Sequence, residues 1–283
     1  MPWQQLTLFT TLQQADPISE LLTNFGSLSI SLEDNADQPL FEPKPGEMPL
    51  WHNVKITALF SADTNLNGLI FLLEQSLQSY QLTTLAEQDW QQQLQQQFQP
   101  IKIGNKLCIT PTWHEITEKK RTHVILDPGL AFGTGSHPTT KLCLEWLEKN
   151  IHDKETILDY GCGSGILAIS ALKLGASAVY AVDHDPQALL STKANAALNK
   201  VNVLTYLPDQ LPNIKTDIII ANIFANCLLE LAPLFHHYIK KNGIVVLSGI
   251  LENQMEAIKK AYSNYFNIKD CKQLEEWFLM ELF

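Results

Sequence analysis

From residue 156 to the end of the chain, the apolar and polar positions follow the alternating strand and helix pattern of an α/β domain. Short continuous apolar runs alternate there with stretches of helical spacing. The predicted strands are 156–160, 178–183, 201–206, 217–221, 243–247, 266–272 and 277–283, and the predicted helices are 165–174, 186–198, 225–239 and 252–262. This alternation predicts a doubly wound, mostly parallel sheet that is covered by helices on both faces.

The first third of the chain has shorter elements in the order β-α-β-β-α-β. Strand patterns span 3–9, 28–32, 53–60 and 81–85. Asp16 and Pro17 predict the N-cap and first turn of a helix that ends near Asn24. Asp63 is the predicted cap of a second helix, whose apolar stripe is Leu66, Leu69, Ile70, Leu73 and Leu77. The order is typical of a ferredoxin-like α+β domain, here residues 1–87.

A glutamine-rich stretch, residues 88–99, separates the two predicted domains. Its apolar residues Trp90, Leu94 and Phe98 are spaced by four, which predicts a linker helix, with a disordered polar tract as the alternative. Residues 100–283 then form the larger domain.

Length and composition indicate a globular protein without a membrane span. No apolar run approaches the roughly 20 residues that a span needs, and the N-terminus lacks a signal-peptide pattern, so we expect a cytoplasmic protein. The five cysteines are scattered singly, which favours reduced thiols over a disulfide framework or a metal site.

The negative charge is concentrated in the first third. Residues 1–98 hold 11 acidic and two basic residues, against 19 and 18 in the remaining 185. Such a surface disfavours nucleic acid and favours a basic protein partner, although acids that only maintain solubility are an equal alternative.

The first chemical motif is Asp159-x-Gly161-x-Gly163-x-Gly165, which ends one predicted strand and opens a helix. Its glycine spacing differs from that of the dinucleotide fingerprint, G-x-G-x-x-G. An acid in front of the turn repels a pyrophosphate but suits a ligand with an amino group and a sulfonium. A purely structural strand-to-helix turn is the alternative.

Asp183 ends the next strand, 22 residues after Gly161. An acid at this distance can accept hydrogen bonds from ribose hydroxyls. Asp185-Pro186 instead resembles the cap and first turn of the following helix. The pair of motifs also fits a nicotinamide-dependent oxidoreductase, which is the alternative enzyme class; a non-catalytic binding module is a third.

Asn222 ends the fourth strand of the sheet. Its amide can orient an attacking amine, hold a cofactor, or cap the helix that starts near Ala225. A further motif, residues 127–140, has three glycines within seven residues but no P-loop lysine. Ser136 and Pro138 predict a helix start, which places Thr140 in the first turn, facing the glycine motif. His137 is expected to be structural.

The combined motifs resemble the PrmA family, bacterial methyltransferases of large-subunit ribosomal protein L11. The resemblance lies in Asp127-Pro-Gly-x-Ala-Phe-Gly-Thr-Gly-x-His-Pro-Thr-Thr140, in Gly161-Cys-Gly-Ser-Gly-Ile-Leu-Ala-Ile169 and in Ala221-Asn-Ile223. It implies a Rossmann-like class I fold and S-adenosylmethionine as cofactor, contacted through Thr140, Gly161, Gly163, Asp183 and Asn222. One departure is Phe224-Ala225-Asn226, where the family commonly has Leu-Ala-Gly.

The resemblance also implies N-methylation of lysine and N-terminal amines on a basic ribosomal protein, docked on the first domain. The sequence contains no triad, carboxylate pair or metal cluster, so we expect no dedicated base and no metal, with Asn222 as a candidate to orient the amine. We further expect a monomer that binds neither nucleic acid nor membrane. A methyltransferase of another protein or of a small molecule is the nearest alternative.

Overall fold

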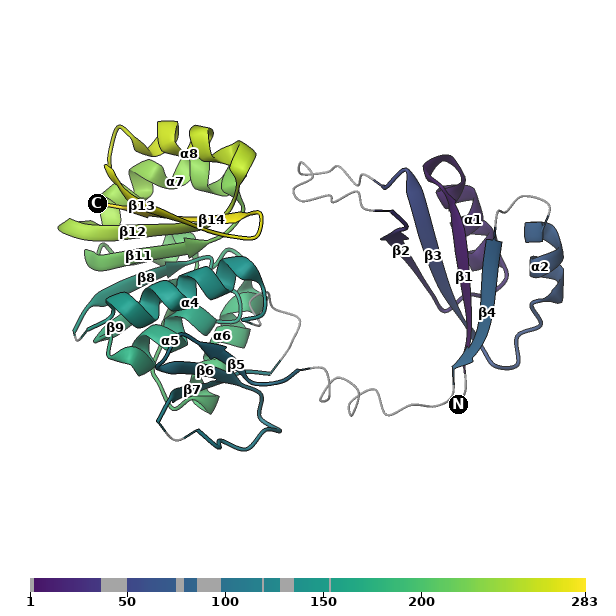
Figure 1. The fold of residues 1–283 in the computed structure, drawn as a ribbon, viewed down its shortest axis with the longest axis horizontal. Helices are drawn as coiled ribbons and strands as arrows, with labels where there is room; N and C mark the ends of the chain where they lie inside the picture. The colour runs from purple at the N-terminus through teal and green to yellow at the C-terminus, as the bar shows by residue number, and fades with distance from the viewer. Residues whose placement is uncertain are drawn as a thin grey trace. The chain divides into compact units, whose positions relative to one another are not determined.

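The computed structural model describes residues 3–36, 50–74, 79–85, 98–118, 120–127, 135–152 and 154–283. They belong to two compact units, Met1–Gln93 and Leu94–Phe283 (Figure 1). Most of the predicted linker helix, 88–99, lies outside the described residues. Within the described part of the chain, no helix is both long and apolar enough to cross a membrane.

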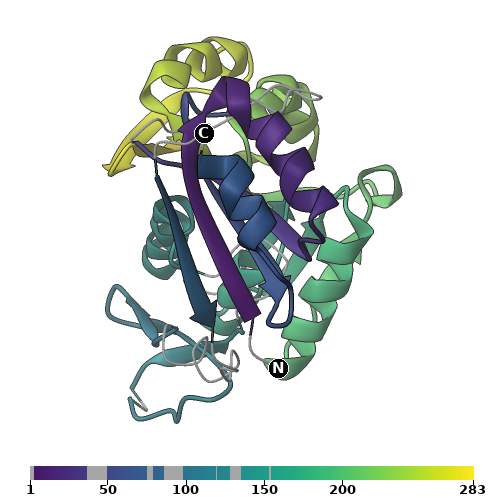
Figure 2. The same cartoon turned by 90° about the vertical axis from the view of Figure 1, so that its right-hand side faces the viewer.

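The first unit is an antiparallel sheet with two helices on one face (Figure 2). In chain order its elements are β1 (Trp3–Thr11), α1 (Leu12–Asn24), β2 (Ser29–Asp34), β3 (Asn53–Ser61), α2 (Asn67–Glu74) and β4 (Ser79–Leu85). The strands are arranged β2-β3-β1-β4, and all neighbours are antiparallel. Alternate residues of β3, from Val54 to Phe60, are buried with Leu69 and Leu73 of α2, so one sheet face carries the core.

Both helix starts predicted for this unit were wrong. Helix α1 begins at Leu12, and Pro17 lies inside it. The helix starts five residues before Pro17 because Ala15 is buried together with Ile18, and because the Leu12 N–H donates to the carbonyl of His52 at 3.0 Å. Asp63 does not cap α2: its carboxylate bonds the Ser61 hydroxyl. The Asn65 side chain instead accepts the Asn67 N–H at 3.0 Å.

The second unit contains a seven-stranded, mostly parallel sheet. Its strands are β8 (Thr156–Tyr160), β9 (Ala178–Val182), β10 (Leu204–Tyr206), β11 (Thr216–Asn222), β12 (Ile239–Leu251), β13 (Ile268–Leu274) and β14 (Trp277–Leu282). Their order is β10-β9-β8-β11-β12-β14-β13, and β14 runs antiparallel to both of its neighbours. The predicted doubly wound α/β sheet is confirmed.

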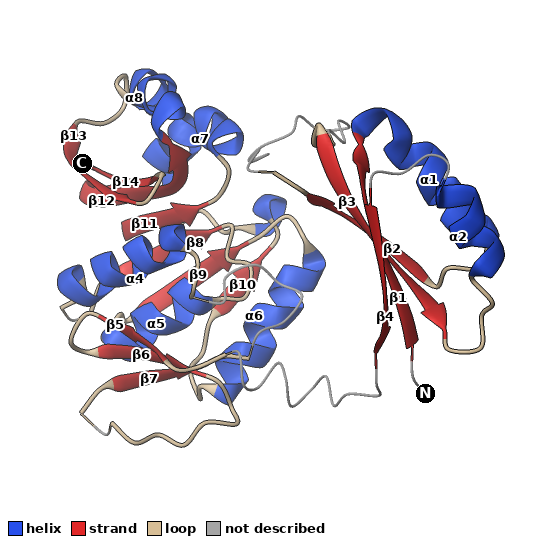
Figure 3. Ribbon diagram, turned by 45° about the vertical axis from the view of Figure 1, so that its right-hand side comes forward, coloured by secondary structure: helices blue, strands red, loops and turns tan. Residues whose placement is uncertain are grey.

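Helices cover both faces of this sheet (Figure 3). One face packs against α4 (Pro138–Asn150), α5 (Ile166–Leu174) and α6 (Pro186–Leu198), and the other against α7 (Ala225–Tyr238) and α8 (Met255–Tyr262). Two short 3-10 turns, η1 (Pro208–Gln210) and η2 (Glu252–Gln254), complete the unit. The strand order reverses between β8 and β11, so their carboxyl ends flank the crevice where ligands bind in such sheets.

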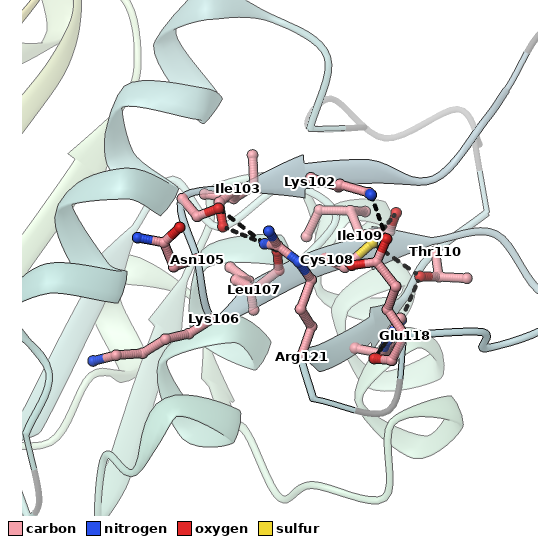
Figure 4. A network of polar contacts seen from close by, with 12 residues as sticks. Lys102, Ile103, Asn105, Lys106, Leu107, Cys108, Ile109, Thr110, Glu118 and Arg121 are labelled. Carbon is pink, nitrogen blue, oxygen red and sulfur yellow. Dashed lines mark hydrogen bonds and ion pairs between the residues drawn. The ribbon is translucent and has the colours of Figure 1, made fainter.

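The second unit also contains a small third sheet, and Figure 4 shows a network of polar contacts among its strands and connections. This sheet comprises β5 (Ile101–Ile103), β6 (Leu107–Thr110) and β7 (Thr122–Ile125). The Arg121 guanidinium donates to the carbonyls of Ile103, Gly104 and Leu107 at 3.4, 2.9 and 3.2 Å. Buried Glu148 of α4 accepts the Asn105 N–H at 2.5 Å and also that of Lys106, which fixes this sheet to α4.

Candidate functional site

The glycine turn that follows β8 uses its own N–H groups within the protein. Gly161 and Cys162 both donate to the carbonyl of Val182, at 2.7 and 3.0 Å. Gly165 donates to the Cys162 carbonyl at 2.8 Å, and Gly163 donates to the Asp183 carboxylate at 2.9 Å. All three glycines have a positive φ, a backbone conformation that would be strained in a residue with a side chain. A pyrophosphate is normally held by free N–H groups of such a turn, and these four are already engaged.

Asp183 lies directly beyond β9, and its carboxylate joins the two predicted motifs. One oxygen accepts the Gly163 N–H and the other accepts the Asp185 N–H at 3.0 Å. Each carboxylate oxygen has further acceptor capacity, and the residue is 8% exposed at the strand's end. Asp183 therefore has a fixed orientation and can still accept a ligand hydroxyl. Asp185 caps α6 as predicted, accepting the Gln187 N–H at 2.9 Å.

Asp159, the acid of the glycine motif, is fully buried rather than directed into solvent. One carboxylate oxygen accepts the Ala168 N–H of α5 at 3.0 Å. The other is buried and has no hydrogen-bond partner among the described residues. Burial, together with the charge of the nearby Asp183 carboxylate, raises the pKa of Asp159 to about 7, although the hydrogen bond from the Ala168 N–H lowers it. The charge of the Asp183 carboxylate, and that of Asp159 when it is ionised, favours a cationic ligand near the carboxyl ends of these strands.

Asn222 at the end of β11 meets Thr140 of α4. The Asn222 amide nitrogen donates to the Thr140 hydroxyl at 3.3 Å, across 82 residues of sequence. The alternative role of Asn222 as the cap of α7 was wrong, because Phe224 is the N-cap residue. The structure thus brings together Thr140 with Asn222, and Gly163 with Asp183.

The segment after Asn222 is held by two glycines. A Cβ atom on Gly161 would lie 2.1 Å from the Ile223 side chain, and one on Gly249 would lie 2.3 Å from the Ile223 carbonyl oxygen. The chain can pass between β8 and β12 only because both positions lack a side chain. Phe224, which follows, is 62% exposed.

The motif at 127–140 is described only at its two ends, since 128–134 lie outside the described residues. At the first end, the Asp127 carboxylate accepts the backbone N–H and the hydroxyl of Thr112, at 2.7 and 2.8 Å. At the second, α4 starts at Pro138 with His137 as its cap, so Ser136 is not the cap. The His137 ring contacts the hydroxyl of Thr139 at 2.8 Å and the ring of Trp277, which agrees with the predicted structural role.

Two residues of this region were missed by sequence reasoning, Thr192 and Asn195 of α6. Their side chains bond the carbonyls of Gly163 and Ser164, at 3.0 and 2.8 Å. The signal was present: with Asn199 they form a polar row at helical spacing on the face that packs inward. A polar row of this kind usually indicates a solvated helix face, and only the packing shows that it is covered.

The donor and acceptor set fits S-adenosylmethionine, the cofactor that the sequence predicts. Acidic groups adjoin the turn, an acid with remaining acceptor capacity follows β9, and four N–H groups of the turn are engaged within the protein. Among the described residues no group of three or more His, Cys, Asp or Glu side chains could hold a metal ion.

Comparisons with known proteins agree with this geometry. A family model described as ribosomal protein L11 methyltransferase (PrmA) matches residues 2–282. The ribosomal protein L11 methyltransferases of Shewanella woodyi and Shewanella putrefaciens are 46% and 45% identical, over 98% of this chain and 97% of each relative. A crystal structure of ribosomal protein L11 methylase from Lactobacillus delbrueckii subsp. bulgaricus has a TM-score of 0.61 and 34% identity, and the match covers 66% of this chain and 98% of that one.

The raised pKa of Asp159 predicts how stability depends on pH. Between pH about 4 and about 7 the native carboxyl keeps a proton that the unfolded chain releases. Stability from this group is therefore present at acid pH and lost as pH rises through that window. Asp159→Asn should raise the free energy of unfolding at pH 8 relative to wild type, by at most on the order of 4 kcal/mol, and by much less at pH 4.

Urea unfolding of both proteins at the two pH values measures this difference. Asp217→Asn is the control of opposite sign. Partial burial raises the pKa of Asp217, but hydrogen bonds from Lys240 and Thr156 lower it overall. Its neutralisation should lower stability at pH 8. An Asp159→Asn effect that is equal at pH 4 and pH 8 would contradict the buried, proton-binding role.

Proposed function

The chain belongs to the ribosomal protein L11 methyltransferase (PrmA) family, and from that premise we propose that it methylates lysine and N-terminal amines of ribosomal protein L11 with S-adenosylmethionine as donor. The observation that carries the choice of cofactor is the internal use of the glycine turn's N–H groups. It disfavours a nicotinamide dinucleotide, whose pyrophosphate needs such donors.

We assign the cofactor contacts to Thr140, Gly161, Gly163, Asp183 and Asn222. Asp183 accepts the ribose hydroxyls, and it is held for this by the N–H groups of Gly163 and Asp185. Gly161 and Gly163 allow close approach of the backbone to the methionine end. Asp159 acts through the field of its carboxyl, since protein atoms already cover it. The bound cofactor supplies a methyl group that its sulfonium charge activates.

The protein's own task is to align an amine and exclude water. An ammonium has no lone pair, so the acceptor must lose a proton first. A lysine with a pKa of about 10.4, or an α-amine at about 7.8, can release it to solvent before burial. We assign Asn222 to orienting that amine. The Asn222 amide nitrogen donates to the Thr140 hydroxyl, and the side-chain carbonyl oxygen of Asn222 can accept an amine N–H.

The first unit is proposed to be the ferredoxin-like domain that docks the basic substrate protein. Its exposed acids Asp16 and Glu20 lie on α1 and Glu74 on α2. Phe71 and Leu72, which precede Glu74 on α2, are also exposed. The opposite face of the sheet differs, because Glu33 there pairs with Lys55 at 2.7 Å. Lys55 is the one basic residue in the described part of this unit. The charge therefore favours the helical face for a basic partner.

The proposed reaction is tested by incubating the full chain with isotope-labelled S-adenosylmethionine and total ribosomal protein. Mass spectrometry of the products should find label on L11, at lysine side chains and the α-amine. Asn222→Ala should reduce this labelling while the protein remains folded. Label on a different protein, or on small molecules only, would refute the proposed substrate and leave the cofactor assignment intact.

The ribose contact of Asp183 makes a quantitative prediction. Asp183→Ala should weaken binding of S-adenosylhomocysteine by about 1–3 kcal/mol, as expected for a lost hydrogen bond to a charged acceptor. Isothermal calorimetry measures the change. Asp185→Ala is the matched control: it removes a neighbouring carboxylate that caps α6, so it should cost stability but little affinity. Equal affinity of Asp183→Ala and wild type would refute the assignment.

The docking proposal predicts that substrate recognition depends on charges of α1. The double variant Asp16→Asn/Glu20→Gln should raise the KM for L11 about two- to fivefold at low salt, and the difference should shrink as salt screens it. Steady-state kinetics at several salt concentrations measure both effects. The control Glu252→Gln/Glu256→Gln removes two exposed acids at the same spacing from the second unit. Identical KM values in all three proteins would contradict electrostatic docking on this face.

A further inference from the structure

Helix α6 presents three polar side chains toward the interior of the second unit. Thr192 is fully buried and Asn199, just after the last helical residue, is 5% exposed. Asn195 lies between them at helical spacing. Buried polar groups are retained where they satisfy other polar groups, so the partners of these residues indicate what they do.

Thr192 and Asn195 bond successive carbonyls of the glycine turn. The Thr192 hydroxyl donates to the Gly163 carbonyl at 3.0 Å and also contacts the Cys162 sulfur at 3.4 Å. The Asn195 amide donates to the Ser164 carbonyl at 2.8 Å. A Cβ on Gly165 would lie 2.8 Å from the Thr192 methyl group, so the turn and α6 are in close contact.

The same network of hydrogen bonds reaches Asp183, the acid proposed to bind the ribose. Gly163 receives the Thr192 bond on its carbonyl, while its own N–H donates to Asp183 at 2.9 Å. Both peptide groups of this one glycine are therefore fixed, one by Thr192 and one by Asp183. If Thr192 releases the carbonyl, Gly163 can rotate, and its N–H no longer holds the Asp183 carboxylate in one orientation.

Asn199 extends the same row to the strand that leads into the 127–140 motif. Its amide accepts the Ile125 N–H at 2.8 Å and donates to the Ile125 carbonyl at 2.6 Å. It also donates to the Asn195 carbonyl at 2.8 Å. One helix face thus holds the glycine turn and the end of β7 in a fixed relation.

We propose that Thr192 and Asn195 are positioning residues of the cofactor site, which act through Gly163 and Ser164 to orient Asp183. This inference rests on the proposed function, because the ligand whose affinity reports it is the proposed cofactor. The residues do not touch the reacting atoms. Their effect should appear as cofactor affinity, with little change in recognition of the protein substrate.

The test compares two substitutions of Thr192 in the full chain. Thr192→Val keeps the methyl group against Gly165 and removes only the hydroxyl donor. It should weaken S-adenosylhomocysteine binding about three- to tenfold, as one neutral hydrogen bond predicts, and raise the KM for S-adenosylmethionine similarly. Thr192→Ser restores the donor and should bring affinity back to within about twofold of wild type. The KM for L11 should stay constant.

Thr216→Val is the matched control. Thr216 is also fully buried, and its hydroxyl donates to a backbone carbonyl, that of Tyr238 at 3.4 Å. It lies at the amino end of β11, whereas the proposed site lies at the carboxyl ends of the strands. It should lower the melting temperature without changing cofactor affinity. Asn195→Ala provides a second variant if Thr192→Val does not fold, and it should also weaken affinity.

The outcomes are distinguishable. Weaker binding by Thr192→Val and Asn195→Ala, with rescue by Thr192→Ser and none by the control, supports the positioning role. Unchanged affinity in folded Thr192→Val or Asn195→Ala overturns it, even if stability falls. Wild-type protein that fails to bind S-adenosylhomocysteine instead overturns the proposed function itself.

Discussion

The hydrogen bond from the Gly163 N–H to the Asp183 carboxylate is the contact on which the arrangement of the site depends. It links the turn after β8 to the residue after β9, two strands that are parallel neighbours. The bond uses an N–H that would otherwise serve a phosphate, and it fixes a carboxylate that would otherwise rotate. A single interaction therefore both disfavours one ligand class and prepares the site for another.

The remaining contacts hold this bond in place from several directions. The Val182 carbonyl accepts two N–H groups of the turn, and the Thr192 hydroxyl donates to the Gly163 carbonyl. On the other side of the strand reversal, Ile223 fits against Gly161 and Gly249, which sets the path of the chain beyond Asn222. These contacts join the glycine turn, α6 and the segment beyond Asn222 in one network within the protein.

The acidic residues of the two units are arranged differently. In the second unit, acids are few at the site but buried close together, so that burial and proximity raise the pKa of Asp159 to about 7. In the first unit, most acids among the described residues are exposed, and residues 1–98 hold 11 acids against two bases, so these charges act at longer range and are screened by salt. The buried acids of the second unit suit a small cationic ligand, and the exposed acids of the first unit suit a basic protein surface.

The sequence alone determined the order of the elements and the motifs. Strand 156–160 and helix 186–198 match β8 and α6 to the residue, because apolar periodicity and the Asp185-Pro186 cap are local signals. Asp183, Gly163, Thr140 and Asn222 were predicted at strand or helix ends for the same reason. Only the tertiary structure decided which of them meet, that α1 starts before Pro17, that Asp159 is covered, and that Thr192 and Asn195 face the turn. Those outcomes depend on packing between segments far apart in the chain, and local propensity and spacing do not report what packs against a residue.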